Sequence, residues 1–395
     1  MRRLSAAAEV LGAFLKLGLG AFGGPVAHLG YFRREFVEKR GWLSGEEYAG
    51  IVAMCQFLPG PASSQTGFCI GLKHAGWLGG LAAFIGFTLP SVLLMIAAAH
   101  WFAHFQNVPM ARGALQGLEI AAVAVVAHAV WNMVRSQCPD TPRQALALLA
   151  AAILILLPNT GGQILVLLLG ALIGRLTLES TTMPRAPTPM PALSPLHHRR
   201  AGTACLAVFL ALLALAFLVP HSGALALFGA FYRSGALVFG GGHVVLPMLR
   251  DAVVVPGWVN APTFMAGYGA AQAVPGPLFT VAAFLGSVSS VGPGGAWGAA
   301  IAIAAIFLPG LLLAASVTPF WDILRNQRGA EAMIKGVNAA VVGLLGAAFV
   351  SLLSINAVQN VWHGPIMLGA LALLTWGRAR PILVVTFCAA AGTIL

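Results

Sequence analysis

The chain contains two copies of one unusual pattern. Residues 14–24 read FLKLGLGAFGG and residues 231–241 read FYRSGALVFGG, so a Phe, a cation, a Gly and a Phe-Gly-Gly triplet recur at a spacing of 217. About forty residues after each copy, CQFLPGP at 55–61 is matched by AQAVPGP at 271–277. A cation and a Pro-Gly-Pro triplet that recur inside apolar sequence indicate an internal duplication, as in many membrane carriers.

The composition is that of a membrane protein. The chain is 59% hydrophobic and 8% charged, whereas a soluble domain carries about 25% charged residues. Its net charge of +11 comes from basic residues scattered through loops, which is typical of membrane anchoring rather than of nucleic-acid binding. The five Cys and the His residues of the apolar segments lack metal, redox or disulfide spacing. We therefore expect an all-α polytopic membrane protein with no metal, no cofactor and no nucleic-acid partner.

The apolar segments form two halves separated by a polar linker. We expect a first membrane repeat at 1–176, a cytoplasmic linker at 177–201, a connecting transmembrane helix at 202–222 and a second membrane repeat at 223–395. One additional crossing between the halves would invert the second relative to the first. The loop at 33–40 carries four Lys or Arg, and its counterpart carries Arg250 alone. The loop at 100–113 carries Arg112 alone, whereas its counterpart at 317–335 carries Arg325, Arg328 and Lys335. The positive charge therefore changes sides between the two halves, as the positive-inside rule requires of an inverted repeat.

The Pro-Gly-Pro triplets predict broken helices. Neither Pro59-Gly60-Pro61 nor Pro275-Gly276-Pro277 fits a continuous helix, because proline has no amide hydrogen and clashes with the preceding turn. Since proline favours the first helical position, a half-helix should begin at the last proline of each triplet. Its free amides would lie near the midplane and bind an anion, and Ser63, Ser64 and Thr280 would add hydroxyl donors. A structural kink without a ligand is the alternative.

Two cations occupy equivalent positions in the repeats, Lys16 and Arg233. A cation at the centre of a membrane helix costs about 2.5–3.5 kcal/mol, which favours a functional role for both. The alternative is that each side chain extends to the membrane surface, since both lie near the start of their segments. The glycine pairs that follow would expose backbone amides to a ligand; they are Gly23, Gly24, Gly240 and Gly241.

Three more polar side chains are candidates for the site. Gln56 and Gln272 precede the two triplets at equal distance, and each could donate to an oxyanion or cap a broken helix. Glu119 is the acid that lies well inside an apolar segment, and Asn338 takes its place in the second repeat. Glu119 is therefore a candidate for proton coupling, with pairing to Lys16 or a place near the membrane surface as alternatives.

The duplicated F-x-[KR]-x-G-x-x-x-F-G-G segment, the Gly-Trp that follows it and the Q-x-x-P-G-P element resemble the chromate ion transporter family, long bidomain type. The resemblance covers about 14–130 and 231–350. It implies a multi-pass protein of the bacterial inner membrane that exports chromate and confers chromate resistance, with sulfate as an analogue and a homodimer as an assembly to consider. The motif residues that carry over, with their second-repeat partners, are Lys16, Gly18, Phe22, Gly23, Gly24, Gln56, Pro59, Gly60 and Pro61.

Chromate is a tetrahedral dianion, so two buried cations would match its charge. Its expulsion from a negative interior releases about 2.3 kcal/mol per charge per 100 mV, and the chain has no phosphate-binding G-x-x-x-x-G-K-[ST] loop for ATP. We expect a secondary active transporter driven by the membrane potential, with proton antiport through Glu119 as an added option. A sulfate or other oxyanion transporter and a passive anion channel are the alternatives. An integral-membrane enzyme is disfavoured, because the sequence shows no cluster of nucleophiles or metal ligands.

Overall fold

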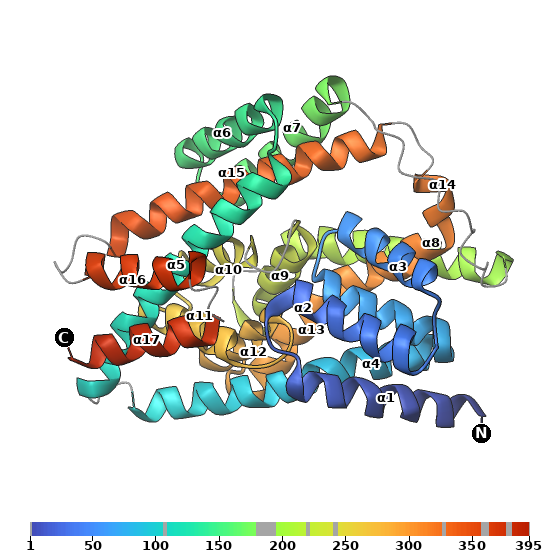
Figure 1. Ribbon diagram of the computed structural model, residues 1–395, viewed down its shortest axis with the longest axis horizontal. Coiled ribbons are helices and arrows are strands. Elements are labelled where there is room, and N and C mark those ends of the chain that lie inside the picture. The colour runs from blue at the N-terminus through green and yellow to red at the C-terminus, as the bar shows by residue number, and fades with distance from the viewer. Residues whose placement is uncertain are drawn as a thin grey trace. The chain divides into compact units, whose positions relative to one another are not determined.

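The computed structural model describes residues 2–105, 109–178, 195–218, 222–239, 244–325, 329–356, 363–376 and 381–394. These residues form helices and connecting turns, as the sequence predicts (Figure 1). The elements of the first repeat are α1 (Arg2–Gly20), α2 (Gly24–Phe32), the π-helical turn η1 (Arg33–Lys39), α3 (Gly45–Phe57), α4 (Ala62–Phe105), α5 (Pro109–Gln137), α6 (Thr141–Leu156) and α7 (Thr160–Thr177).

The connecting helix and the second repeat follow. They comprise α8 (Pro195–Leu218), α9 (Gly223–Ala236), α10 (Val245–Val253), α11 (Ala261–Ala273), η3 (Leu278–Thr280), α12 (Val281–Val288), α13 (Gly295–Val317), η4 (Thr318–Phe320), α14 (Trp321–Arg325), α15 (Ala330–Asn356), α16 (His363–Thr375) and α17 (Pro381–Ile394). Gly240 and Gly241, two of the candidate site residues, and most of the predicted linker lie outside the described residues.

The helices pack in two compact units, and each unit takes helices from both sequence repeats. The first unit consists of residues 1–97, 182–245 and 274–327, and the second of residues 98–181, 246–273 and 328–395. Both predicted Pro-Gly-Pro breaks belong to the first unit. The repeats are therefore interleaved within each unit, which lets equivalent segments of the two repeats meet.

Both predicted helix breaks are confirmed. Helix α3 ends at Phe57 and α4 begins at Ala62, while α11 ends at Ala273 and η3 begins at Leu278. The glycine between the two prolines has a φ of +116° in the first triplet and +104° in the second. Only glycine adopts such a φ without strain, so the central residue of each triplet is required for the turn.

Helix α4 is a hairpin of two helical limbs. Ala75 and Gly76 have non-helical backbone angles, and beyond them the chain folds back so that Gly79 packs against Gly71. The part before this bend, residues 62–74, is here called the first half-helix. At 1.5 Å per residue it is about 20 Å long, too short to cross the roughly 30 Å hydrocarbon layer of a bilayer.

The second repeat forms the same hairpin from separate helices. Elements η3 and α12, residues 278–288, are here called the second half-helix, and α13 is the long limb beside it. Gly286 packs against Gly298, which reproduces the contact of the first hairpin. A backbone contact of this kind needs small residues on both helices, because any larger side chain would separate the two limbs.

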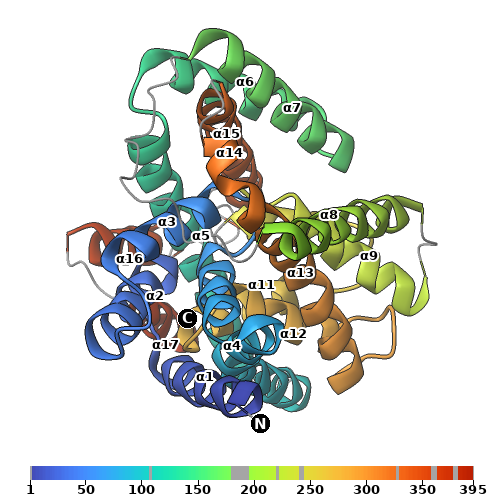
Figure 2. The same cartoon turned by 90° about the vertical axis from the view of Figure 1, so that its right-hand side faces the viewer.

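The long limb of each hairpin packs against the first helix of its repeat. In the first repeat Gly18 of α1 lies against Phe87 of α4, and Figure 2 shows α1 alongside α4. In the second repeat Gly235 of α9 lies against Ile306 of α13. The paired residues are separated by 217 and 219 positions, so the two repeats build equivalent helix pairs.

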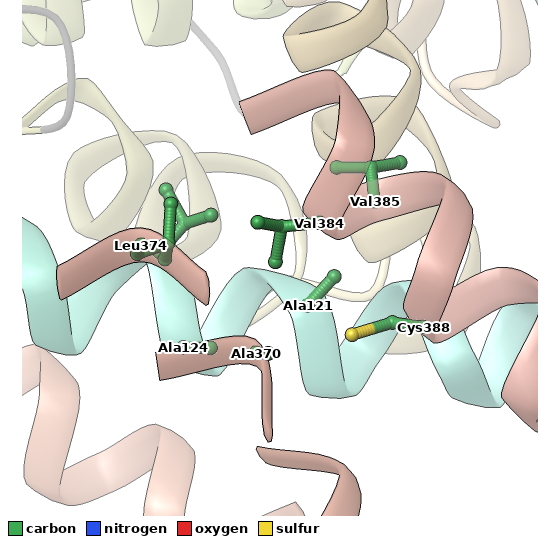
Figure 3. Packing of buried hydrophobic residues seen from close by; sticks show 8 residues of the cluster. Ala121, Ala124, Ala370, Leu374, Val384, Val385 and Cys388 are labelled. Carbon is green, nitrogen blue, oxygen red and sulfur yellow. The ribbon is translucent and has the colours of Figure 1, made fainter. Parts of the chain in front are cut away.

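The second unit is built around α5 and α15. Helix α5 packs with α16 and α17 around a cluster of small and branched side chains (Figure 3). Helix α15 packs against α6 and α7, which lie along it in Figure 1. The apolar segment 144–174 is also interrupted, since the Asn159 side chain accepts a hydrogen bond from the Gly162 amide and starts α7. The buried residues of the cluster are Ala121, Ala124, Val125, Ala370, Leu374, Val384, Val385 and Cys388.

Five of the described helices are long and apolar enough to cross a membrane. Several shorter apolar helices, among them α6, α7, α16 and the second half-helix, are below that length. Long spans mixed with short apolar helices are what the broken segments of the sequence predict. The five candidate spans are 62–104, which includes both limbs of the α4 hairpin, and 116–137, 199–218, 295–320 and 330–351.

The glycine contact between α1 and α4 yields a stability prediction. A Cβ atom at Gly18 would lie 2.7 Å from the Phe87 carbonyl oxygen, so Gly18→Ala must push the helices apart and should cost about 1–3 kcal/mol. Gly12 is exposed on the same helix, and a Cβ atom there would meet no neighbour within 4 Å, so Gly12→Ala should be neutral or stabilising. Thermal unfolding in detergent should show a lower midpoint for Gly18→Ala alone. Equal midpoints for the two variants would contradict this packing.

Candidate functional site

At each helix break a backbone hydrogen bond joins the Pro-Gly-Pro triplet of one repeat to a residue of the other repeat. The Gly60 amide of the first triplet donates to the Val238 carbonyl at 2.7 Å, and the Gly276 amide of the second donates to the Ala21 carbonyl at 2.9 Å. Ala21 and Val238 are themselves equivalent, because each immediately precedes the Phe-Gly-Gly triplet of its repeat. The duplicated motifs therefore meet by reciprocal exchange, with the Pro-Gly-Pro turn of each repeat bound to the glycine motif of the other.

Side chains satisfy the carbonyls that the proline turns leave free. The Ser91 hydroxyl donates to the Pro275 carbonyl at 2.6 Å. The Gln65 amide donates to the Pro59 carbonyl at 2.8 Å and to the Gly310 carbonyl at 3.0 Å. Ser91 and Gly310 are equivalent positions in the two long limbs. Ser91 donates from its side-chain hydroxyl, whereas Gly310 accepts with its backbone carbonyl. An unpaired buried carbonyl would cost about 1–3 kcal/mol, so these contacts hold both breaks in place.

The start of the first half-helix is polar and buried. Helix geometry leaves the amides of Ala62, Ser63 and Ser64 without acceptors inside the helix. Ser63 and Ser64 are each 2% exposed, and within the described residues the Ser64 hydroxyl has no hydrogen-bond partner. Free amides, a positive helix end and a buried hydroxyl donor form a suitable environment for an anion.

His28 fixes the position of this helix start. Its Nε2 lies 3.1 Å from the Ala21 carbonyl, which can only accept, so Nε2 carries the proton. Its Nδ1 then accepts from the Ser63 hydroxyl, at 3.4 Å. The Ala21 carbonyl thus accepts from both His28 and Gly276, and it connects α2, the first half-helix and the second triplet. His28 therefore has a packing role.

The start of the second half-helix is mostly apolar. Its first residues are Leu278, Phe279 and Thr280, all buried, and the Thr280 hydroxyl donates to the Pro277 carbonyl at 2.7 Å. This hydroxyl is therefore engaged within its own turn. The two half-helices thus share a backbone arrangement but differ in the polarity of their first residues. Within the described residues the Ser64 hydroxyl at the first half-helix has no partner, whereas the Thr280 hydroxyl at the second has one.

The two candidate cations have separate surroundings. Lys16 is exposed on α1, where its charge acts on Glu35. Arg233 is half-buried on α9, its guanidinium donates to the Ala216 carbonyl near the end of α8, and it lies 5.6 Å from the centre of the Phe217 ring. The contacts of Arg233 are those of a cation at a helix C-terminus.

The remaining candidates lie at different places. In the first unit Gln56 is exposed near the end of α3, and Gly23 and Gly24 form the turn that starts α2, with Gly23 as its N-cap. In the second unit Gln272 is bonded to Tyr268 on α11, and its amide nitrogen has no partner in the described part of the chain. The two glutamines, equivalent in sequence, therefore belong to different units and have different surroundings.

Glu119 is half-buried on α5 in the second unit. Within this unit His363, at the start of α16, acts electrostatically on the Glu119 carboxyl group. No group of three or more His, Cys, Asp or Glu side chains able to hold a metal ion occurs among the residues that the structure describes.

Sequence reasoning missed Gln65. Its side chain bonds to Gly310, which is 245 residues away, so its role depends on how the repeats meet. A signal was present, because Gln65 follows Ser63 and Ser64 in a run of polar residues directly after a helix break. The first turn of a helix that begins inside apolar sequence is a place where every polar side chain needs a partner.

Outside the candidate spans, the basic side chains of the 33–40 loop form ion pairs with nearby carboxylates. Arg40 bonds to Glu35 at 2.8 Å and to Glu9 at 3.2 Å, and Lys39 lies 3.6 Å from Glu35. The hydrogen bond from Arg40 holds the pKa of Glu35 below its ordinary value. The basic loop at 33–40 is therefore partly neutralised by acids of α1 and η1.

Comparison with known proteins identifies the family. The family model for chromate transporters matches residues 8–175 and 225–393, which are the two repeats. A chromate transport protein of Pseudomonas aeruginosa is 29% identical, over 96% of this chain and 90% of its own. A probable chromate transport protein of Synechococcus elongatus is 28% identical (96% and 93%), and a chromate transport protein of Cupriavidus metallidurans is 26% identical (86% and 80%). No solved structure matches the chain. The chain belongs to the chromate transporter family, a family of membrane transport proteins and not of enzymes.

Proposed function

We propose that this protein exports chromate across the inner membrane of a bacterium, and that the anion binds at the start of the first half-helix. The observation that carries the proposal is the buried helix start at Ser63 and Ser64, joined through Ala21 to the opposite triplet. Chromate has four oxygens that accept hydrogen bonds, and the free amides and the Ser64 hydroxyl donate them. The names of the relatives support chromate as the substrate.

The membrane potential supplies the driving force in this proposal. Moving a dianion out of a negative interior releases about 4.6 kcal/mol at 100 mV, which corresponds to a gradient of about a thousandfold. Export by this route needs no ATP. Proton antiport through Glu119 is a further part of the proposal, and sulfate is the competing substrate because it shares the charge and shape of chromate.

Alternating access would come from movement at the helix breaks. Short half-helices that meet across two repeats are the usual construction of a carrier's central site. The reciprocal bonds of Gly60 and Gly276 support this mechanism, because each turn can change partners only if the opposite repeat moves as well. A passive channel would need no such exchange, and single-channel currents in planar bilayers would reveal one.

The helix start yields the first transport prediction. Ser64→Ala removes a donor to a charged ligand, which is worth about 1.5–3 kcal/mol, so the KM for chromate should rise at least about tenfold. The measurement is radiolabelled chromate flux in proteoliposomes under an imposed potassium diffusion potential, with unlabelled sulfate as competitor. Ser136→Ala on the exposed face of α5 is the matched control and should leave flux unchanged. A wild-type KM in the Ser64→Ala variant would show that the anion does not bind at this helix start.

The cations yield a second transport prediction. Lys16→Met and Arg233→Met should each abolish chromate flux at normal expression, because a dianion in a membrane needs compensating positive charge. Lys39→Met, at an exposed lysine of η1, is the control. Normal flux in both Met variants would show that the helix start binds the anion without these side chains.

A further inference from the structure

The second unit contains a cavity that the proposed transport site does not use. Its volume is about 350 Å³, enough for on the order of ten waters or for a small ion with part of its hydration shell. Helices α6, α7, α10 and α15 line it, all within the second unit. Most of the wall is apolar, and the polar lining residues are Gln163, Arg250, Asp251 and Ser351.

These four side chains are held in fixed positions. The Arg250 guanidinium donates to the Ser351 hydroxyl at 3.3 Å, and the Gln163 amide donates to the Asp251 carboxylate at 2.6 Å. Gln163 is 6% exposed, so its amide is buried. Arg250 and Asp251 are neighbours on α10, yet their side chains bond to different helices, α15 and α7. Arg250 therefore faces a largely apolar cavity beside a carboxyl group, and its hydrogen bond to Ser351 uses one of its five donors among the contacts of the described residues.

We propose that this cavity binds one small tetrahedral oxyanion against Arg250, and that the anion binds together with a proton on Asp251. With Asp251 ionised, the two neighbours sum to zero charge and the carboxylate repels an anion. With Asp251 protonated, the cavity carries the charge of Arg250, and the carboxyl group becomes a donor. Anion binding and proton binding at the cavity therefore favour each other, as linkage requires.

Asp251 changes its protonation state close to neutral pH. Burial raises the pKa of Asp251 to about 6, against the opposing effects of Arg250 and of the hydrogen bond from Gln163. Of the lining residues from α6, α7, α10 and α15, Arg250 is the charged group that faces Asp251, and Gln163 and Ser351 are the polar ones. An anion beside Arg250 would raise the pKa further, so protonation near neutral pH accompanies binding.

The first repeat does not duplicate this arrangement. The residues 217 positions before Arg250 and Asp251 are Arg33 and Arg34, which are exposed on η1, and Arg33 lies 3.6 Å from Glu38. The pairing of a cation with a half-buried carboxyl group on α10 is therefore a feature of the second repeat, while helices of both repeats line the cavity.

The test is sulfate binding by isothermal titration calorimetry of the full chain in detergent, at pH 5.5 and pH 7.5. The Ser64→Ala variant is the background, because it weakens the proposed transport site without touching the cavity. Affinity should fall about tenfold per pH unit above the pKa of Asp251, and at pH 7.5 buffers of different ionisation enthalpy should show uptake of about one proton per sulfate.

Two variants make the test specific. Asp251→Asn keeps the acceptor for Gln163 and mimics the protonated acid, so it should bind sulfate at pH 7.5 as tightly as the parent does at pH 5.5. Arg250→Gln should lose binding at both pH values. Unchanged affinity and pH dependence in Arg250→Gln would overturn the proposal, as would binding of short-chain phosphatidylglycerol in place of sulfate. Because Ser64 is already replaced, either result leaves the proposed transport function to be judged by its own flux assay.

Discussion

The structure depends on the need to satisfy buried backbone groups wherever an apolar helix is interrupted. Water is absent from the interior of a bilayer, so a free amide or carbonyl there must find a partner inside the protein. At both Pro-Gly-Pro triplets that partner comes from the other repeat, through Gly60 to Val238 and through Gly276 to Ala21. The duplicated motifs are therefore two halves of one hydrogen-bonded arrangement, and neither break is complete within its own repeat.

The same arrangement explains why the halves can differ in chemistry. Backbone bonds place the two half-helices, so their side chains are free to diverge. The first half-helix begins with Ser63, Ser64 and Gln65, and the second with Leu278 and Phe279. The asymmetry continues in the second unit, where Arg250 and Asp251 of α10 line a cavity while the equivalent residues of η1 are two exposed arginines. A symmetric backbone thus supports repeats whose side chains differ in polarity.

The sequence predicts the features that local chemistry decides. Proline cannot continue a helix, so the breaks at Pro59 and Pro275 and the turn before α7 follow from the residues themselves. The partners of the broken ends could not be predicted, because Val238 and Ala21 are about two hundred residues away and their role depends on packing. Arg233 shows the same limit, since its bond to Ala216 depends on where α8 ends. The interleaving of the repeats in each unit is likewise a long-range property.

The most direct test of this account is a cross-link between the repeats at one break. In a chain with its five native cysteines replaced and a protease site inserted at the linker, cysteines at Ala21 and Val274 should be joined by a short bifunctional thiol reagent, because Ala21 bonds to Gly276. The cleaved chain would then migrate as one band. A control pair at Ala21 and Trp297, at the far end of the second hairpin, should give two bands. Two bands for both pairs would show that the repeats do not meet at their breaks.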